Sequence, residues 1–413
     1  MAAAQVLRCS ALVGTFCLLA FLSAVAATSL SEADGQTATT WKAWALPRRE
    51  AHMSGDCDDA DGVGLSLLQS HRRVGPAMDR RQAPRPAYLP IFAMHGIFDS
   101  AADVEDICLG IKELRPGTEC VAIRVAEGPV KSLATPMMTQ VEKARHFILD
   151  KIAEGPDAFR SGFNLICHSQ GGLVCRGLIS KWTDIQYPIK TFVSLAGPQQ
   201  GVDSYSDIML PSFLHGVGSE VFYQQLPQAS FSAPGYWKDM TMYGTYQKLS
   251  QFLAVINNEI PEQQCSFSML PFGCRPNGCT FVGPLDGCAW PGGVEYFGKN
   301  KEMQQNFERL EHAVFCGSPA DGVIVPWQST VWGYYAKGNG TMAKDHVVLP
   351  FEETVLGKYN LVPLRSMNAS GKLHMITPAN VTHNDWKIRR SGEFAIDAQK
   401  RSFVLSLFLE YLK

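Results

Sequence analysis

One short segment of the sequence has the composition of a catalytic turn. An apolar run ends at Cys167, the residues His168-Ser169-Gln170-Gly171-Gly172 follow, and a second apolar run begins directly afterwards. This pattern predicts a strand, a tight turn and a helix, with the Ser169 hydroxyl raised above the sheet edge as a nucleophile. The same pattern also arises by chance around an inert serine. Cys167 occupies the position where such turns usually carry a glycine.

A serine hydroxyl is a weak nucleophile that needs a base, and the base needs an acid to orient it. In hydrolases with this turn, the acid and then the histidine follow the serine along the chain. Asp321 follows a strand-like run and is the predicted acid; the alternative is an aspartate that caps its own turn. Of three later histidines, His346 and His374 lie in strand-like runs. His383 lies in a loop and is the predicted base.

Two backbone N–H groups are predicted to stabilise the negative charge that develops on the substrate carbonyl oxygen. One belongs to Gln170, directly after the nucleophile. The other belongs to Ile97, in the loop at residues 95–100 that follows the first core strand. Each such donor lowers the barrier by roughly 3–4 kcal/mol in hydrolases of this kind. We expect His95, in the same loop, to be a packed residue and not a second base.

The chain around these residues alternates between strand-like and helical patterns from Tyr88 onward. Such alternation predicts a mostly parallel central sheet with helices on both faces, and the Ser–Asp–His order indicates an α/β-hydrolase. The alternation breaks at about residues 198–310, where Gly, Pro, aromatic residues and Cys predict a lid-like insertion. The expected strands span 90–94, 120–125, 163–167, 190–195 and 313–316, and the expected helices span 101–114, 135–154, 171–181, 245–258 and 398–412.

The N-terminus has the features of a secretory signal peptide. Arg8 precedes an apolar run and Ala24-Val25-Ala26 is a small-residue cleavage site, so residues 1–27 are predicted to be removed. An uncleaved signal anchor is the alternative. The run is short for a membrane span of roughly 20 residues, so we expect no stable membrane insertion after cleavage. Residues 28–87 have the composition of a flexible leader or propeptide, and residues 88–413 form the predicted hydrolase domain.

Composition and cysteine content restrict the partners and the compartment. A net charge of -2, without blocks of like charge, argues against nucleic-acid binding. Of the twelve cysteines, ten remain once the predicted signal peptide is removed, and an even number in a secreted chain indicates disulfides. Those in the insertion lack a Cys-x-x-Cys pair, which favours two local disulfides over a zinc site, and the sequence predicts neither a metal nor a cofactor. The insertion cysteines are Cys265, Cys274, Cys279 and Cys288, and the candidate glycosylation sites are Asn339, Asn368 and Asn380.

Four separate blocks of the sequence, in the same order, resemble the palmitoyl-protein thioesterases. The Cys-x-Ser-Gln-Gly-Gly-Leu-Val-Cys-Arg form is most similar to the second, lysosomal type of this family. The resemblance implies the same roles for Ser169, Asp321 and His383 as the residue patterns do. The blocks are His95–Ser100, Cys167–Arg176, Ser194–Gln199 and Asp321–Ser329.

The resemblance also implies a substrate and a compartment. It implies hydrolysis of long-chain fatty acyl thioesters, either S-palmitoyl proteins or acyl-CoA, in the lysosome, with plain secretion as the alternative. It further implies a disulfide between Cys167 and Cys175 across the nucleophile turn, against the alternative of two buried thiols. The residues alone do not separate thioesters from oxygen esters. A lipase or carboxylesterase with the same triad, or a catalytically silent lipid-binding protein, are therefore the competing hypotheses.

Overall fold

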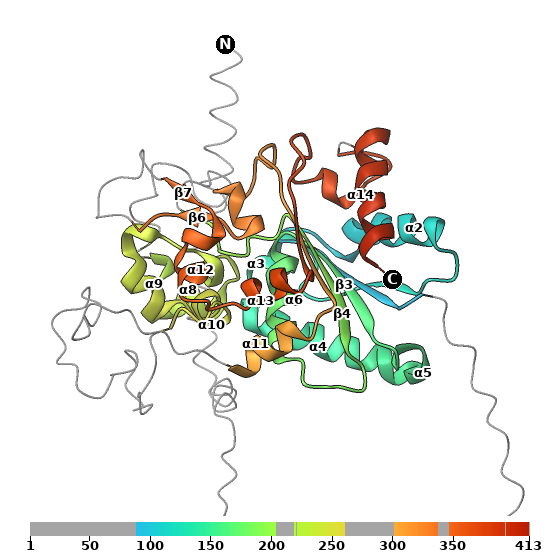
Figure 1. Cartoon of the computed structure of the whole chain (residues 1–413), viewed down its shortest axis with the longest axis horizontal. Helices are drawn as coiled ribbons and strands as arrows, with labels where there is room; N and C mark the ends of the chain where they lie inside the picture. Colours follow the sequence, from blue (N-terminus) through green and yellow to red (C-terminus); the bar gives the residue numbers. More distant parts are fainter. Residues whose placement is uncertain are drawn as a thin grey trace, which may run out of the picture. The chain divides into compact units, whose positions relative to one another are not determined.

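A six-stranded parallel sheet forms the centre of the fold (Figure 1). The computed structural model describes residues 88–203, 219, 221–260, 301–337, 347–392 and 394–412. The strand order is β2-β1-β3-β4-β5-β8, and all five neighbouring pairs are parallel, which confirms the α/β-hydrolase prediction. The strands are β1 (Ile91–Met94), β2 (Cys120–Ala122), β3 (Phe163–His168), β4 (Ile189–Leu195), β5 (His312–Cys316) and β8 (Leu373–Ile376).

Helices cover both faces of this sheet (Figure 1). On one face, α2 and α14 pack on the central strands; Ile107 and Ile111 recur at helical spacing and give α2 one apolar side. On the other face, α6 follows β3 and contacts both α4 and α11. The helices around the sheet are η2 (Ala101–Val104), α2 (Glu105–Leu114), α3 (Gly128–Leu133), α4 (Met137–Glu154), α5 (Pro156–Phe159), α6 (Gln170–Lys181), α11 (Lys301–Glu308) and α14 (Ala398–Tyr411).

Several element boundaries differ from the sequence prediction. Strand β2 is shorter than expected because the last ladder bond on that side, from Ile123 N–H to Ala93 O, is followed by a turn. The helix expected from residue 101 begins as a 3-10 turn, which Ser100 and Asp103 cap reciprocally. The helix expected over 135–154 begins two residues later, at Met137, with Pro136 at the N-cap position.

Between β4 and β5 the described residues form short helices beside the sheet. The sequence predicts one helix over 245–258, but the structure has two. The chain is extended at Ser250, and the buried Phe252 packs its ring against Gly177 of α6. This tertiary contact outweighs the local helical preference. The elements here are α8 (Gln225–Ser230), η4 (Ala233–Tyr236), η5 (Met240–Met242), α9 (Tyr243–Leu249) and α10 (Leu253–Ile256).

After β5 the chain adds a small antiparallel pair, β6 and β7, and several short helices before β8 and α14. These elements are only two to six residues long, too short to give the periodic pattern that marks the strands and helices of the main sheet. They are η6 (Trp327–Val331), β6 (Tyr334–Tyr335), β7 (Val348–Leu349), η8 (Phe351–Glu353), α12 (Val355–Lys358), α13 (Leu364–Ala369) and η9 (Asp385–Lys387).

A buried ion pair connects the helices between β4 and β5. The Nζ of Lys238 lies 2.7 Å from Oε1 of Glu259, and both side chains are almost fully excluded from solvent. The hydroxyls of Tyr243 and Tyr246 donate to the same carboxylate, at 3.1 and 2.5 Å, and Asn257 donates to it at 2.8 Å. Each buried charge in this cluster therefore has the partners that its burial requires.

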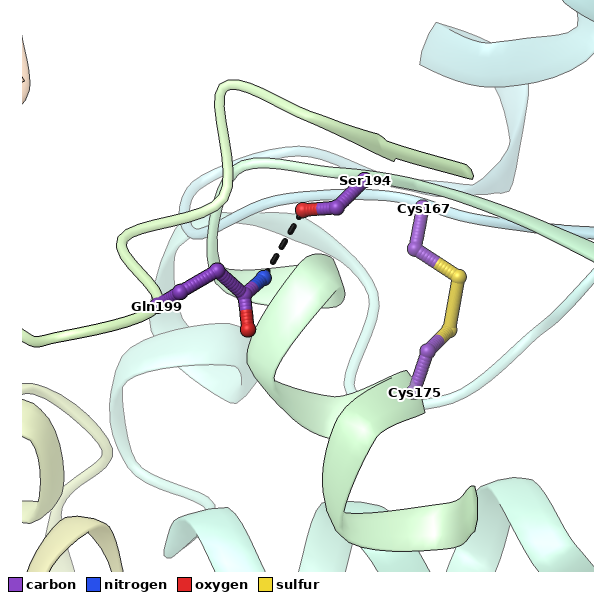
Figure 2. The surroundings of a disulfide bond; sticks show 4 residues. All are labelled: Cys167, Cys175, Ser194 and Gln199. Atoms are coloured by element: carbon purple, nitrogen blue, oxygen red, sulfur yellow. Dashed lines mark hydrogen bonds between the residues drawn. A yellow bond between two sulfur atoms is a disulfide. The ribbon is translucent and has the colours of Figure 1, made fainter. Parts of the chain in front are cut away.

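Two disulfides occur in the described residues. Cys167, near the end of β3, is bonded to Cys175 in the second turn of α6, with Cα atoms 6.6 Å apart (Figure 2). This confirms the pairing that the family resemblance implies. A second bond, between Cys108 of α2 and Cys120 of β2, was not predicted. Cys316 is buried and free, and burial raises the pKa of its thiol, which argues against reactivity.

Several predictions fall outside the described residues: the signal peptide, the leader, His346, Asn339 and the four insertion cysteines. Within the residues that are described, no group of three or more His, Cys, Asp or Glu side chains is arranged to hold a metal ion. None of the described helices is both long and apolar enough to cross a bilayer.

Candidate active site

Ser169 occupies the turn between β3 and α6, at the carboxyl end of the strand. Its φ is 54° and its ψ is -129°, a region that favours glycine and that other residues occupy only when the surroundings impose it. The Ser169 N–H donates to Leu195 O of β4 at 2.9 Å, and Ser169 O accepts from Gly172 N–H at 2.8 Å. These bonds hold the turn on both sides, in the geometry that a nucleophile elbow requires.

Close packing around the elbow explains two of its glycines. A Cβ on Gly96 would lie 2.8 Å from the Cβ of Ser169 and 3.3 Å from its Oγ. A Cβ on Gly171 would lie 2.4 Å from His95 O. The loop after β1 therefore passes directly against the serine, and a side chain at either glycine would push the two segments apart.

The two predicted oxyanion donors lie on the segments that meet at this contact. Gln170 begins α6, so its N–H belongs to the first turn, which has no partners within the helix. Ile97 follows Gly96 in the loop. Ser132 of α3 anchors both segments: its Oγ accepts from Phe98 N–H at 2.7 Å, and its carbonyl accepts from the Gln170 side chain at 3.3 Å. The assignment of Ile97 and Gln170 as donors stays a prediction.

The predicted acid and base are hydrogen-bonded to each other. Nδ1 of His383 lies 2.9 and 3.1 Å from the two carboxylate oxygens of Asp321, and His383 N–H donates to Asp321 O at 3.1 Å. Asp321 Oδ1 also accepts from the N–H groups of Val323 and Ile324. Burial alone would raise the pKa of Asp321, but His383 and these N–H groups lower it below its ordinary value. Because Asp321 accepts the hydrogen bond from Nδ1–H, Nε2 of His383 is the ring nitrogen that is left to accept a proton.

Two other histidines have different surroundings. The ring nitrogens of His95 lie 2.9 Å from Gly96 O and 2.9 Å from Val125 O, so His95 is a packed loop residue, as expected. His374 lies in β8, where its Nε2 is 3.1 Å from Nδ1 of His312. Of these histidines, His383 is the one that hydrogen-bonds Asp321.

A network of hydrogen bonds and an ion pair next to His383 was not predicted from the sequence. Nε2 of His168, the residue before Ser169, lies 2.9 Å from the backbone carbonyl oxygen of His383. Asp99, in the loop after β1, forms an ion pair with Lys387, whose Nζ lies 3.1 Å from Oδ1. In the sequence, His168 is one ordinary residue of the turn, and Asp99 and Lys387 are two charged residues far apart along the chain. Only their proximity in the folded structure identifies them as a network.

Known proteins resemble the segment of the chain that carries this candidate site. The palmitoyl protein thioesterase family matches residues 90–383, a span that includes Ser169, Asp321 and His383. The lysosomal thioesterase PPT2 of Homo sapiens is 29% identical over 310 residues, which cover 74% of this chain and 86% of that protein.

Two further relatives, at lower identity, are similar over a comparable part of the chain. The lysosomal thioesterase PPT2 homolog of Drosophila melanogaster is 26% identical over 306 residues, covering 74% of this chain and 88% of that protein. Palmitoyl-protein thioesterase 3 of Dictyostelium discoideum is 25% identical over 299 residues, covering 72% of this chain and 86% of that protein. Because the family match extends over most of the described sheet and its loops, the chain belongs to the palmitoyl protein thioesterase family.

Proposed function

We propose that this protein is a serine hydrolase that cleaves long-chain fatty acyl thioesters through an acyl-enzyme on Ser169. The observation that carries the proposal is the buried Asp321–His383 pair on the same edge of the sheet as a serine held at positive φ. The class of bond is inferred from the family and from relatives named as thioesterases. The side chains of the triad act equally on oxygen esters.

Acylation begins with the transfer of the Ser169 hydroxyl proton to Nε2 of His383. Oγ attacks the thioester carbonyl carbon, and the N–H groups of Ile97 and Gln170 donate to the oxygen that becomes negative. The carbon–sulfur bond then breaks, and the leaving thiolate takes the proton from His383. Asp321 stays ionised throughout and stabilises the imidazolium that forms in between.

Deacylation repeats these steps with water. His383 removes a proton from a water molecule, whose oxygen attacks the acyl-serine carbonyl carbon. The bond between that carbon and Ser169 Oγ breaks, the serine regains its proton from His383, and the free fatty acid leaves. The proposed chemistry requires no metal and no cofactor.

A two-stage experiment tests this proposal. Covalent labelling by a fluorophosphonate probe, compared between the wild type and Ser169→Ala, tests the nucleophile. Turnover of palmitoyl-CoA, compared with turnover of a p-nitrophenyl ester, tests the class of bond. We expect labelling of the wild type only, and thioester turnover. An unlabelled wild type would support the silent lipid-binding alternative, and ester turnover without thioester turnover would support a lipase or carboxylesterase.

We further propose that the protein enters the secretory pathway and acts in the lysosome. Relatives are named as lysosomal, and the lowered pKa of Asp321 keeps its carboxylate ionised in an acidic compartment. Asn368 and Asn380 are exposed, as attachment of a glycan requires. Glycosidase digestion of the secreted protein should shift its mobility on a gel, and N-terminal sequencing should show whether residues 1–27 alone or also residues 28–87 are removed.

We also propose domain boundaries for the mature chain. Residues 88–413 would form the hydrolase domain, with residues 198–310 as an insertion that borders the acyl-binding region. In the described part of the insertion, Phe222 packs edge-on against Trp237, and the Tyr223 hydroxyl accepts a hydrogen bond from Asp239 N–H. These two aromatic side chains are therefore packed residues, and the acyl-chain specificity is expected to depend on other residues of the insertion.

A further inference from the structure

The backbone of His383 is held at both of its polar groups. Its N–H donates to Asp321 O, and its carbonyl oxygen lies 2.9 Å from Nε2 of His168. The rings of the two histidines are 4.8 Å apart between centroids. His168 is joined to Ser169 by a single peptide bond, so the bond to His383 O connects the predicted base to the residue adjacent to the nucleophile.

The protonation state of His168 follows from this contact. A carbonyl oxygen only accepts hydrogen bonds, so the proton of the neutral ring must be on Nε2. Nδ1 lies 3.6 Å from Asp99 Oδ2, too far for a hydrogen bond, and has no hydrogen-bond partner among the described residues. Burial lowers the pKa of His168 to about 4, so above that pH the ring is neutral and still donates to His383.

A second contact lies beside the first. The Nζ of Lys387 is 3.1 and 3.2 Å from the carboxylate oxygens of Asp99. Asp99 is two residues after Ile97, and Lys387 is four residues after His383. Burial raises the pKa of Asp99, but His168, in its protonated form, and Lys387 lower it overall, so the Asp99 carboxylate stays ionised. The loop after β1 and the loop that carries His383 are therefore linked to each other as well as to the elbow.

We propose that His168 is a positioning residue, whose Nε2–H group holds the backbone of His383 at the distance from Ser169 that proton transfer requires. The inference rests on the proposed serine-hydrolase function. It differs from a purely structural role because it depends on one hydrogen-bond donor at one place. A displacement of about 1 Å between reacting groups is enough to slow catalysis roughly 100-fold.

Two amide substitutions separate the donor from the bulk of the side chain. The amide nitrogen of Gln can take the place of Nε2, whereas the shorter Asn can reach only the place of Nδ1. We therefore compare His168→Gln with His168→Asn, by kcat and KM for palmitoyl-CoA and by the second-order rate constant of fluorophosphonate labelling. We expect His168→Asn to lower kcat and the labelling rate by roughly 10- to 100-fold with little change in KM, and His168→Gln to remain within a few-fold of the wild type.

Controls distinguish this role from a general loss of stability. His374→Gln and His374→Asn change a histidine of β8 that hydrogen-bonds His312, and they should leave the labelling rate unchanged. Circular dichroism and thermal melting check that each variant is folded. If His168→Asn does not fold, His168→Phe replaces it, because phenylalanine is a ring without a donor and the same loss is expected.

The possible outcomes separate this inference from the proposed function. A His168→Asn protein within twofold of the wild type, or a His168→Gln protein as impaired as His168→Asn, would overturn the positioning role. A wild type that is labelled but does not cleave palmitoyl-CoA would overturn the thioesterase proposal alone, because the labelling rates still compare the two variants. A wild type that is not labelled would overturn both.

Discussion

The disulfide between Cys167 and Cys175 encloses the predicted nucleophile, and its removal should affect stability and reactivity together. Ser169 lies inside the eight-residue interval between the two cysteines. The double substitution Cys167→Ala/Cys175→Ala opens this loop. The second disulfide, between Cys108 and Cys120, spans 12 residues and contains no predicted site residue, so Cys108→Ala/Cys120→Ala is a matched control.

The expected loss of stability follows from the length of each loop. With the chain-entropy relation for cross-links, a separation of 8 residues gives about 2.5 kcal/mol and a separation of 12 gives about 2.8 kcal/mol at 25 °C. The two double variants should therefore lose nearly equal free energies of unfolding. Both losses are smaller than the free energy of unfolding of a typical domain, roughly 5–15 kcal/mol, so both variants should remain folded.

The two double variants should differ in the reactivity of Ser169. The positive φ of Ser169 stores strain of roughly 1–3 kcal/mol, and we expect the disulfide across the turn to help maintain this conformation. If opening the loop lets the turn relax by about 1.4 kcal/mol, the rate of labelling falls about tenfold. The control disulfide lies between α2 and β2, so its removal should leave the turn intact.

Urea denaturation gives the free energies of unfolding, and the fluorophosphonate labelling rate, measured in the absence of urea, reports on the serine. We expect nearly equal losses of stability and a slower labelling rate only for Cys167→Ala/Cys175→Ala. Equal labelling rates in the two variants would refute the view that this disulfide holds the elbow. An unchanged free energy of unfolding would refute the loop-entropy estimate.

Three further predictions concern the acid, the buried ion pair and pH. Asp321→Asn presents an amide N–H to Nδ1 of His383 and so favours the wrong tautomer; kcat for palmitoyl-CoA should fall by roughly 10⁴-fold with little change in melting temperature, and an unchanged kcat would exclude Asp321 as the acid. Lys238→Met removes the cation that pairs with the buried Glu259 carboxylate, so urea denaturation should show a loss of roughly 3–5 kcal/mol, partly recovered on adding Glu259→Gln; no loss would contradict the importance of the pair. Burial lowers the pKa of His168 from 6.5 to about 4, so the unfolded chain binds more protons between these values; the stabilisation is complete above pH 6.5, and about 3 kcal/mol is lost as the pH falls to 4. His168→Gln should flatten this part of the curve of unfolding free energy against pH, and an unaltered curve would contradict the assignment.

Much of the central sheet could be predicted from the sequence. The strands around residues 90–94, 163–167, 190–195 and 313–316 are apolar runs of the length that a strand buried on both faces requires, and all four occur in the structure. The helix expected at 245–258 is the clearest exception. The helical periodicity of this segment is real, because α9 and α10 both lie within it. The break between them depends on the burial of Phe252 against Gly177 of α6, a contact with a residue about 75 positions earlier in the chain.

The candidate site divides in the same way. The turn around Ser169 is recognisable in the sequence because its demands are local: small residues are needed at Gly171 and Gly172, where strand and helix approach each other. Asp321 and His383 could be proposed from their loop positions and from their order along the chain. Their hydrogen bond is a property of the folded chain, since 62 residues separate them.

The sequence by itself therefore determined the main strands and helices of the sheet, their order and the residue types that can act as nucleophile, acid and base, because periodicity and turn chemistry depend on neighbouring residues. Only the tertiary structure decided that Cys108 of α2 pairs with Cys120 of β2, and that His168 and the Asp99–Lys387 pair lie next to the predicted base. Strand β8 is three strands away from β3 in the sheet, yet the loop after it returns to the end of β3. Contacts of this kind arise from the packing of the whole chain, so no local pattern in the sequence encodes them.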